Sequence, residues 1–396
     1  AEGSGRSEKI WLINQSKNKI GLFKYPKNVK GVPVTTEFVS EHFAQIVANR
    51  LGMPCAEINI GTRNSKIGCM SYSFLDKGDE IIHGVDFITN LYPNYDPDKM
   101  YDRESNTYYS LDMIIDSITA IFKTSDDRTP ILSNIVSMMI FDMVIGNTDR
   151  HQNNWGIKVN FKEKYFSFAP FYDNGSSLCC YINENNIDDM LGNDIVRYNA
   201  LVDSKSTSRI RIDGKVKKEP KHTDVMRYLY NKNPIIFKKT FEDIVNKLDS
   251  KWIDAMLDNY PEEILSKNRK ILISKFLNSK MGLLKQIASI CRELVNMVDA
   301  LYLIWKSPES RKNYTVGKLT KNNDKYYFEY SDEFYVAKDN GFSVLIPFQD
   351  EKKVYESDNL FPVFENRLPD KKRKDIKEIL DKYGMKEYDS FKLLKE

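Results

Sequence analysis

The chain has 396 residues, of which 41% are hydrophobic and 29% charged, a composition typical of a globular protein with two or three domains. A formal net charge of +3 is too close to zero to indicate direct nucleic-acid binding, and no apolar run reaches the roughly 18 residues that span a bilayer, so we expect no membrane span. The five cysteines follow no metal-binding spacing, which predicts reduced thiols and a cytoplasmic protein.

The first 80 residues show the elements of a small β-rich lobe. A Gly/Ser turn that holds Ser4 and Gly5 precedes an apolar run at 10–13, and the backbone N–H groups of such turns can lie against phosphate. The next run, IGLFKYP, is typical of a strand and carries Lys24 among apolar neighbours. Its place, after a Gly/Ser turn and before a helix, is where a kinase holds its phosphate-binding lysine.

The helix expected after the Lys24 strand offers an acidic partner. Apolar residues recur at helical spacing over 36–51, and Gly52 ends the pattern. Glu37 and Glu41 lie one turn apart, and either of them could form an ion pair with the strand lysine; a solvent-exposed carboxylate is the alternative. Further on, SYSFL followed by the polar DKGDE predicts a hinge between two lobes.

The middle of the chain carries the strongest functional signal. An apolar run over 135–145 ends in a polar turn that holds Asp149 and Asn154. Two strand-like runs, 155–160 and 165–168, follow and are joined by a charged turn. A carboxylate and a carboxamide five positions apart therefore lie just after an element that we expect to be buried, and a hairpin follows them.

The hairpin delivers a second carboxylate, Asp173. An Asp-x-x-x-x-Asn spacing followed by a later Asp-containing turn is the layout of a kinase catalytic loop and its metal-binding Asp. Asp149 can accept the proton of an attacking hydroxyl, while Asn154 and Asp173 offer the hard oxygen ligands that suit Mg²⁺ on the phosphates of ATP. Each of these residue types is also common in loops, so the prediction depends on the ordered set.

The remaining patterns predict a loop, a helical region and a small further domain. The Ser/Arg/Lys-rich stretch 203–222 shows no periodicity, and we expect a mobile surface loop there. Apolar stripes predict helices over 224–306. After a break at 306–310, alternating runs joined by an NND turn predict a β-hairpin, and we expect a small α+β domain at 311–396.

These motifs resemble those of the HipA-like serine/threonine kinases, the toxin kinases of bacterial toxin–antitoxin modules. The family's phosphate loop, lysine strand, first long helix, catalytic loop and metal-binding turn are similar, in that order, to GSGRSEKIWLI, GLFKYP, SEHFAQIVANRLGMP, GNTDRHQNNWG and APFYDNGSSL. Residues 312–382 are similar to the small N-terminal subdomain of long HipA proteins, placed here after the kinase core. The resemblance implies an α+β, two-lobed protein-kinase-like fold: a small β-rich N-lobe at 1–80, a mostly helical C-lobe at 81–306 and the small domain at 311–396.

The resemblance also implies roles for individual residues. Asp149 would be the catalytic base, with His151 ordering its loop, and Asn154 and Asp173 would bind Mg²⁺. Ser4 falls where family members carry a regulatory autophosphorylated serine. The residues expected to hold ATP are Ser4, Gly5, Lys24, its helix partner Glu41 rather than Glu37, and Ser73 and Phe74 through backbone groups facing adenine.

The acceptor implied by the resemblance is a protein, with a translation-related protein as the first expectation, and an antitoxin or repressor is the expected protein partner. Three alternatives remain. The chain could be a phosphoinositide-type lipid or small-molecule kinase, or a nucleotide-binding regulatory module without turnover. A metal-dependent hydrolase built from Asp149, His151 and Asp173 would have no need of the upstream Gly/Ser loop and lysine.

Overall fold

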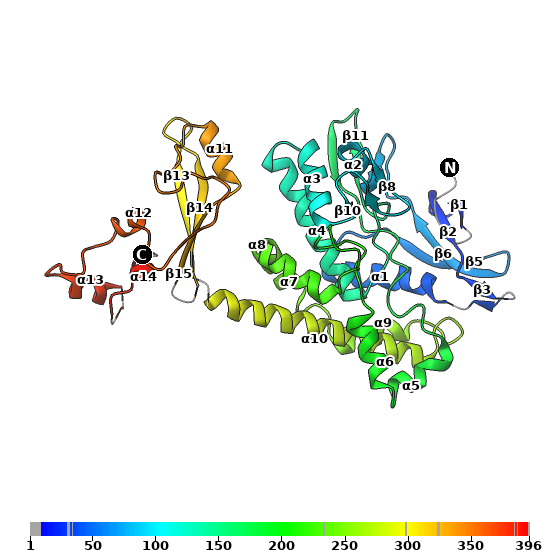
Figure 1. Cartoon of the computed structure of the whole chain (residues 1–396). Coiled ribbons are helices and arrows are strands. Elements are labelled where there is room, and N and C mark those ends of the chain that lie inside the picture. The colour runs from blue at the N-terminus through cyan, green and yellow to red at the C-terminus, as the bar shows by residue number, and fades with distance from the viewer. Residues whose placement is uncertain are drawn as a thin grey trace. The chain divides into compact units, whose positions relative to one another are not determined.

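The computed structural model describes residues 9–394 apart from 30–31, 34, 233, 298, 323–324, 384 and 386. The chain divides into two compact units, Ala1–Ser289 and Ile290–Glu396 (Figure 1). The first unit holds every described residue that the sequence places at a catalytic or nucleotide-binding site.

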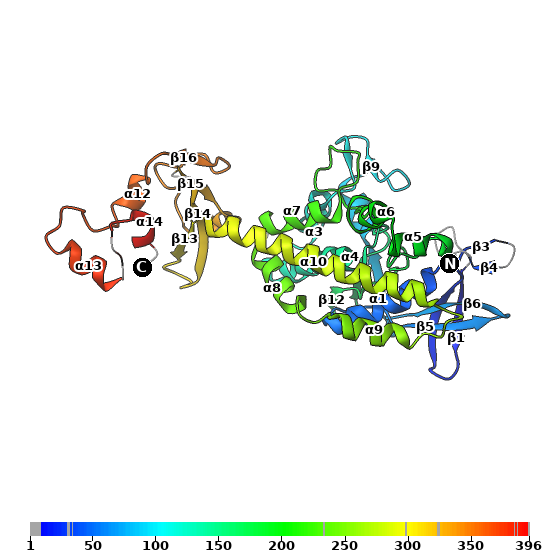
Figure 2. The same ribbon diagram turned by 90° about the horizontal axis from the view of Figure 1, so that it is seen from below.

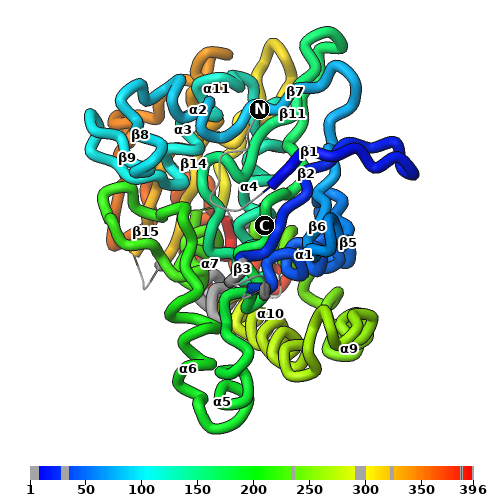
Figure 3. Tube along the Cα trace, turned by 90° about the vertical axis from the view of Figure 1, so that its right-hand side faces the viewer, coloured from blue at the N-terminus to red at the C-terminus, as the bar shows by residue number. Residues whose placement is uncertain are grey.

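An antiparallel sheet stands at the N-terminal end of the first unit. Its strands follow the order β1 (Lys9–Asn14), β2 (Lys19–Lys24), β6 (Lys66–Tyr72) and β5 (Ile58–Arg63). Helix α1 (Glu37–Leu51) packs against β5 and β6 (Figure 3) and ends at Gly52, whose φ of 79° is the left-handed geometry that glycine adopts without strain. A short ribbon of β3 (Asn28–Val29) and β4 (Val32–Pro33) precedes this helix. The predicted strand around Lys24 and the helix after it are both present.

A second sheet carries the segments that lead to the candidate catalytic residues. Its strands follow the order β12 (Tyr165–Phe168), β11 (Gly156–Asn160) and β7 (Glu80–His83). The β11–β12 hairpin matches the two predicted strand-like runs to within one residue. Because β11 also pairs with β7, the segments predicted as catalytic loop and metal-binding turn flank a hairpin whose first strand is paired on both sides.

Helix α4 (Ser125–Ile145) forms the core beneath the catalytic loop. By length and composition it could cross a membrane, but 61% of its most apolar window is buried inside the protein. Its last turns are buried all round, and Gly146 ends it with a φ of 66°. The loop that follows therefore starts from a fixed point.

Further helices complete the first unit. Helix α10 crosses the near face of the unit in Figure 2, and its Phe276 and Lys280 lie so close to Gly146 that a Cβ there would meet Phe276 at 2.5 Å. The helices and short strands are α2 (Gly84–Leu91), β8 (Tyr95–Asp96), β9 (Tyr101–Asp102), β10 (Thr107–Tyr108), α3 (Leu111–Ile121), α5 (Ile187–Leu191), α6 (Ile195–Asn199), α7 (His222–Lys232), α8 (Pro234–Ile244), α9 (Ser250–Asp258) and the part of α10 (Lys267–Met297) up to Ser289.

The stretch 203–222 is folded, which differs from the mobile loop that the sequence suggested. Its two arms are joined by backbone hydrogen bonds from the N–H of Ser208 to the carbonyl of Pro220 (2.9 Å) and from the N–H of His222 to that of Ser206 (2.9 Å). Ser206, Ser208 and Ile210 are buried. Tertiary contacts order this segment. Because such contacts require no periodic pattern of apolar residues, the sequence shows no sign of this order.

The second unit is a small α+β body around its own apolar core. Its sheet follows the order β13 (Asp299–Lys306), β14 (Asn313–Asn322), β15 (Lys325–Tyr330) and β16 (Tyr355–Ser357), and its helices are α11 (Glu333–Asp339), α12 (Pro362–Glu365), α13 (Ile376–Lys382) and α14 (Ser390–Leu393). The β14–β15 hairpin was predicted.

Strand β13 was predicted as helix. Its residues alternate between partly buried and exposed positions, as a strand requires, but the exposed positions include Tyr302 and Ile304. Apolar side chains therefore lie on both faces of the strand, and the run YLIW shows no alternation of apolar and polar residues. Such a run cannot be distinguished in the sequence from the apolar stripe of a helix.

Candidate active site

Three charged side chains from separate elements of the first unit meet at one point. The Lys24 amine at the end of β2 lies 2.5 Å from Oε1 of Glu41 on α1 and 2.8 Å from Oδ1 of Asp173, which follows β12. The second Glu41 oxygen accepts the backbone N–H of Asn174 (3.1 Å). A Cβ at Gly175 would lie 3.2 Å from the Glu41 side chain, so the glycine permits this close approach. Of the two candidate partners on α1, Glu41 is the one placed at Lys24.

The charges in this cluster favour the ionised forms of Lys24 and Asp173. Burial alone would lower the pKa of the Lys24 amine, but the carboxylates of Asp173 and Glu41 outweigh burial and raise that pKa above its ordinary value. The Lys24 amine in turn holds the pKa of Asp173 well below its usual range. At neutral pH Lys24 is therefore a cation and Asp173 an anion.

The catalytic loop is shaped by hydrogen bonds among its own residues. The Asn154 side-chain amide donates to the carbonyl oxygen of Asp149 (2.8 Å), and the N–H of Asp149 donates to Oδ1 of Asn147 (3.1 Å). Nδ1 of His151 accepts the N–H of Asn153 (3.2 Å). Burial lowers the pKa of His151, so the ring is neutral at pH 7 and is placed to shape the loop.

The buried guanidinium of Arg150 joins the catalytic loop to the metal-binding turn. Its Nε and Nη2 donate to both carboxylate oxygens of Asp142 (3.0 and 2.7 Å), a bidentate pair at the end of α4. Its remaining donors reach the carbonyl oxygens of Asn154 (2.8 Å) and Tyr172 (2.7 Å) and Oδ1 of Asn174 (2.6 Å). One side chain therefore sets the spacing of the two loops.

The sequence analysis missed Arg150, although a signal was available. Asp142 interrupts an apolar run that the fold buries, and it is 3% exposed. A carboxylate in such a place needs a cationic partner, because an unpaired buried charge is costly. The nearest cation in the sequence is Arg150.

A cavity of about 310 Å³ lies beside Lys24 and has the size of a small-molecule site. One side of it is apolar: Trp11, Leu22, Phe74, Leu75, Ile81 and Tyr172. The Phe74 and Tyr172 rings stack with centroids 5.7 Å apart. Ser73 also lines the cavity, and its N–H donates to the carbonyl of Ile20 (2.8 Å).

A second cavity, of about 470 Å³, adjoins the first and is mostly polar. It contains Asp149, and it shares with the first cavity Lys9, Lys24, His151 and Asp173. The shared residues mark where a ligand could pass from the apolar cavity to the candidate base.

Lys9 and Arg209 belong to the site, although the sequence analysis did not single them out. Lys9 stands opposite Lys24 in the β1–β2 register and lines both cavities; burial lowers its pKa, and the charge of Asp173 opposes that effect. Nε of Arg209 donates to Oδ1 of Asp149 (3.1 Å). Lys9 could have been found from its place opposite Lys24 in the predicted sheet. Nothing in the sequence indicates Arg209.

Two residues of the site are suited to hold Mg²⁺. Asn154 and Asp173 line the same cavity, and Mg²⁺ is usually held by one or two carboxylates together with phosphate oxygens and water. Over the described ranges, no group of three or more His, Cys, Asp or Glu side chains is arranged to hold a metal ion. Ser4 and Gly5 of the expected phosphate loop lie outside the described residues.

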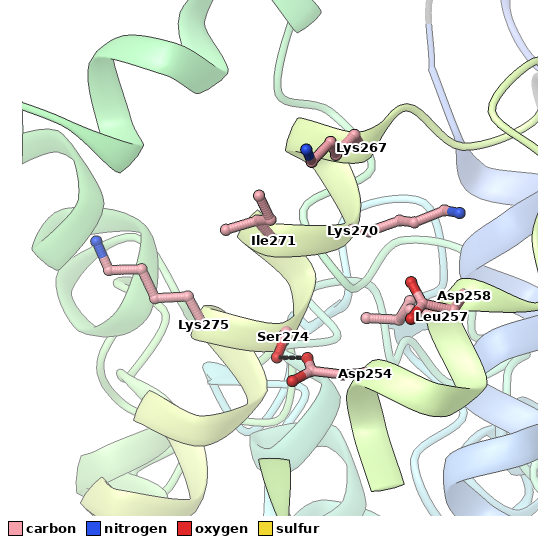
Figure 4. A pocket seen from close by; sticks show the side chains of 8 residues that line it. All are labelled: Asp254, Leu257, Asp258, Lys267, Lys270, Ile271, Ser274 and Lys275. Carbon is pink, nitrogen blue, oxygen red and sulfur yellow. Dashed lines mark hydrogen bonds between the residues drawn. The ribbon is translucent and has the colours of Figure 1, made fainter. Parts of the chain in front are cut away.

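Another cavity, of about 580 Å³, lies between α9 and α10 and contains none of the predicted site residues (Figure 4). Its polar groups are largely used within the fold: the Ser274 hydroxyl donates to Asp254 (2.5 Å), and the Lys270 amine donates to the carbonyl of Tyr260 (2.5 Å). The active-site interpretation therefore stays with the cavities at Lys24.

The chain is similar to known proteins in sequence and in fold. The chain is 24% identical over 290 residues to the serine/threonine-protein kinase CtkA of Helicobacter pylori, which covers 72% of this chain and 83% of that protein. The crystal structure of CtkA matches with a TM-score of 0.60 at 20% identity, over 72% of this chain and 95% of that one. A HipA–HipB–operator DNA complex from Shewanella oneidensis matches with a TM-score of 0.48 at 11% identity, over 75% of this chain and 67% of that one.

The likeness to CtkA confirms the predicted α+β, kinase-like fold. The family model of the HipA-like C-terminal domain matches residues 3–252, and that of the HipA N-terminal domain matches residues 311–396, in the inverted order that the sequence suggested. The chain therefore belongs to the family of proteins with a HipA-like C-terminal domain.

Proposed function

We propose that the protein is a serine/threonine protein kinase that uses ATP and Mg²⁺ to phosphorylate a hydroxyl group of another protein. The observation that carries this proposal is the convergence of Lys24, Glu41 and Asp173 where an apolar cavity meets a polar one that contains Asp149. The likeness to a serine/threonine-protein kinase supports the choice of a protein acceptor.

In this proposal the adenine of ATP lies in the apolar cavity and its phosphates extend past Lys24 and Lys9. Both amines would neutralise negative charge on the phosphates. Positioning and neutralising phosphate charge is most of what phosphoryl transfer requires of a protein. Mg²⁺, when bound, would offset further phosphate charge, and Asn154 and Asp173 are the residues that would hold it.

Asp149 stands where an acceptor hydroxyl would enter. The hydroxyl oxygen forms a bond to the γ-phosphorus, the bond between that phosphorus and the bridging oxygen of ADP breaks, and the hydroxyl proton passes to the Asp149 carboxylate. Asn154, through its bond to the carbonyl of Asp149, keeps the base and the metal ligand in one loop conformation.

Several finer expectations are part of the proposal. The lobes would span 1–80 and 81–306 and the small domain 311–396, whereas the compact units divide after Ser289. Autophosphorylation at Ser4, a translation-related acceptor and an antitoxin partner remain predictions. Mass spectrometry of the full chain after incubation with MgATP, alone and in a cell lysate, tests the first two of these.

The central test is Asp149→Asn. We expect the variant to bind an ATP analogue with unchanged affinity and to transfer phosphate roughly a hundredfold more slowly or worse, the range that a general base contributes. Asp126→Asn, an exposed carboxylate in the first turn of α4, serves as the control and should behave like wild type. Lost affinity for the analogue in Asp149→Asn would contradict the assignment, because it would make Asp149 a structural residue.

A further inference from the structure

The segment 205–221, termed the basic segment, concentrates positive charge. Of its 17 residues, seven are basic (Lys205, Arg209, Arg211, Lys215, Lys217, Lys218 and Lys221) and two are acidic (Asp213 and Glu219), so its net charge is 7 − 2 = +5, against +3 for the whole chain. The rest of the protein is therefore slightly acidic. No residue of the segment is aromatic.

The basic segment is held in place along its length. Besides the bonds that join its arms, the N–H of Tyr108 donates to the carbonyl of Gly214 (2.7 Å), and the Lys215 amine donates to the carbonyl of Ser105 (2.5 Å). The Arg211 guanidinium donates to the carbonyl of Lys217 (3.0 Å) and lies over the Tyr108 ring. The charges of Arg211 and Lys215 therefore occupy defined positions, and the backbone that carries the exposed lysines is held in place.

The basic segment reaches the candidate catalytic base. Arg209 donates from Nε to Asp149 (3.1 Å) and from Nη1 to Glu219 (2.8 Å). Lys218 is the chain neighbour of Glu219 and is exposed, as is Lys217. Two ion pairs thus connect the base to a surface that carries adjacent lysines.

Four carboxylates around the acceptor side of the site share two cations. Glu41 and Asp173 share Lys24, and Asp149 and Glu219 share Arg209. The amine of exposed Lys215, by contrast, donates to the neutral carbonyl of Ser105. Each set of two carboxylates and one cation carries a net charge of 1 − 2 = −1, so the positive charge near the base comes from the exposed lysines of the basic segment, Lys215, Lys217 and Lys218.

We infer that the basic segment binds the polypeptide that carries the acceptor hydroxyl and selects acidic residues beside that hydroxyl. The inference rests on the proposed kinase function. An extended peptide rises about 3.3 Å per residue. When its acceptor hydroxyl lies at Asp149, the residues a few positions before or after that hydroxyl can therefore reach the basic segment. A polypeptide fits better than single-stranded nucleic acid, because sites for the latter combine basic grooves with aromatic side chains on which bases stack, and the segment has none.

The test compares serine peptides of equal length whose flanking residues, on either side, are Asp/Glu, Ala or Lys. For the full chain with MgATP we expect kcat/KM to be roughly tenfold higher for an acidic peptide than for the Ala peptide and lowest for the Lys peptide, since each exposed ion pair contributes a few-fold at most. The preference should shrink as salt is added, because salt screens exposed charges. Equal rates for all three peptides would overturn the inference while leaving the kinase intact.

Charge reversal locates the preference. Lys217→Glu/Lys218→Glu should lose the discrimination between acidic and Ala peptides, whereas Lys238→Glu/Lys239→Glu, an exposed pair on α8, should keep it. Both pairs are exposed, so both variants should fold, and equal melting temperatures check this. A Lys217→Glu/Lys218→Glu variant that retains the full preference overturns the inference.

Two further outcomes are informative. An RNA oligonucleotide that competes more tightly than the acidic peptide would overturn the polypeptide assignment in favour of nucleic acid. Failure to phosphorylate any peptide or any lysate protein would overturn the proposed function, and with it this inference.

Discussion

At the scale of single residues, the site depends most on the buried amine of Lys24. An ammonium group removed from water is costly unless carboxylates compensate it. Glu41, which is 2% exposed, does so from a position fixed by the N–H of Asn174, while Asp173 is more accessible. Glu41 therefore fixes the position of the Lys24 amine from the buried side, and Asp173 contacts it from the side open to solvent; in the proposed function Asp173 is the partner that would meet the nucleotide and its metal.

Glu41→Gln tests this division. The amide keeps the volume of the side chain but removes the charge that holds Lys24, and we expect phosphate transfer to fall by roughly ten- to a hundredfold, the cost of misplacing a catalytic group by about 1 Å. Glu37→Gln, one turn earlier on α1, is the matched control, because Glu37 bonds to Thr35 and not to Lys24. Steady-state kinetics with saturating ATP measures both, and equal losses in the two variants would contradict the assigned roles.

At the scale of elements, α10 supports the catalytic loop from beneath. Lys280 is fully buried, and its amine donates to the Ser206 hydroxyl (2.6 Å), which in turn bonds to Nδ1 of His222 (2.8 Å). Burial lowers the pKa of Lys280 to about 7, with Asp203 and Cys179 opposing the shift. Helix α10 thus contacts Gly146, which ends α4, and Ser206, near the start of the basic segment.

This burial predicts how stability depends on pH. Lys280 titrates near pH 7 in the folded chain and near its ordinary value of 10.5 in the unfolded chain, so between these values the unfolded state binds more protons. The free energy of unfolding should therefore rise with pH over this window, by up to about 1.4 kcal/mol per pH unit from this group. Below pH 7 the contribution is constant and unfavourable.

Lys280→Met isolates the effect. The methionine fills similar space and does not titrate, so the stability of wild type relative to the variant should increase as pH rises from 7 towards 9.5. Urea denaturation of both proteins at several pH values measures this difference. A difference that stays constant with pH would show that Lys280 keeps its proton in the fold.

At the scale of the whole molecule, each compact unit holds its own core. In the second unit, Leu319, Leu360 and a group of phenylalanines are buried together, and the Phe328 and Phe348 rings stack with centroids 4.1 Å apart. The HipA N-terminal domain match begins at residue 311, so β13 pairs with β14 from outside that match. Separate cores of this size are typical of domains that unfold as units.

Phe328→Ala tests this independence. Removing a fully buried phenylalanine should lower the stability of the second unit by about 3–5 kcal/mol, because the fold closes only partly around the space left behind. Calorimetry should show one transition moved to lower temperature, with the affinity of the first unit for an ATP analogue unchanged. Weaker binding of the analogue would show that the second unit supports the nucleotide site.

The sequence by itself determined the local elements of the site and their order. The strand at Lys24, the helix of Glu41 and the β11–β12 hairpin all appear within a residue or two of their predicted bounds. These elements could be predicted because periodicity, helix ends and turns depend on neighbouring residues. The Asp149-to-Asn154 spacing and the later Asp173 are likewise local features, and they were enough to suggest the chemistry.

Only the tertiary structure decided which distant groups meet. That Arg150 joins two loops through Asp142 and that Arg209 reaches Asp149 are consequences of packing. No periodic pattern records such contacts, because a buried charge is stabilised by whatever partner the fold brings to it. For the same reason the basic segment looked mobile in the sequence and is ordered in the fold.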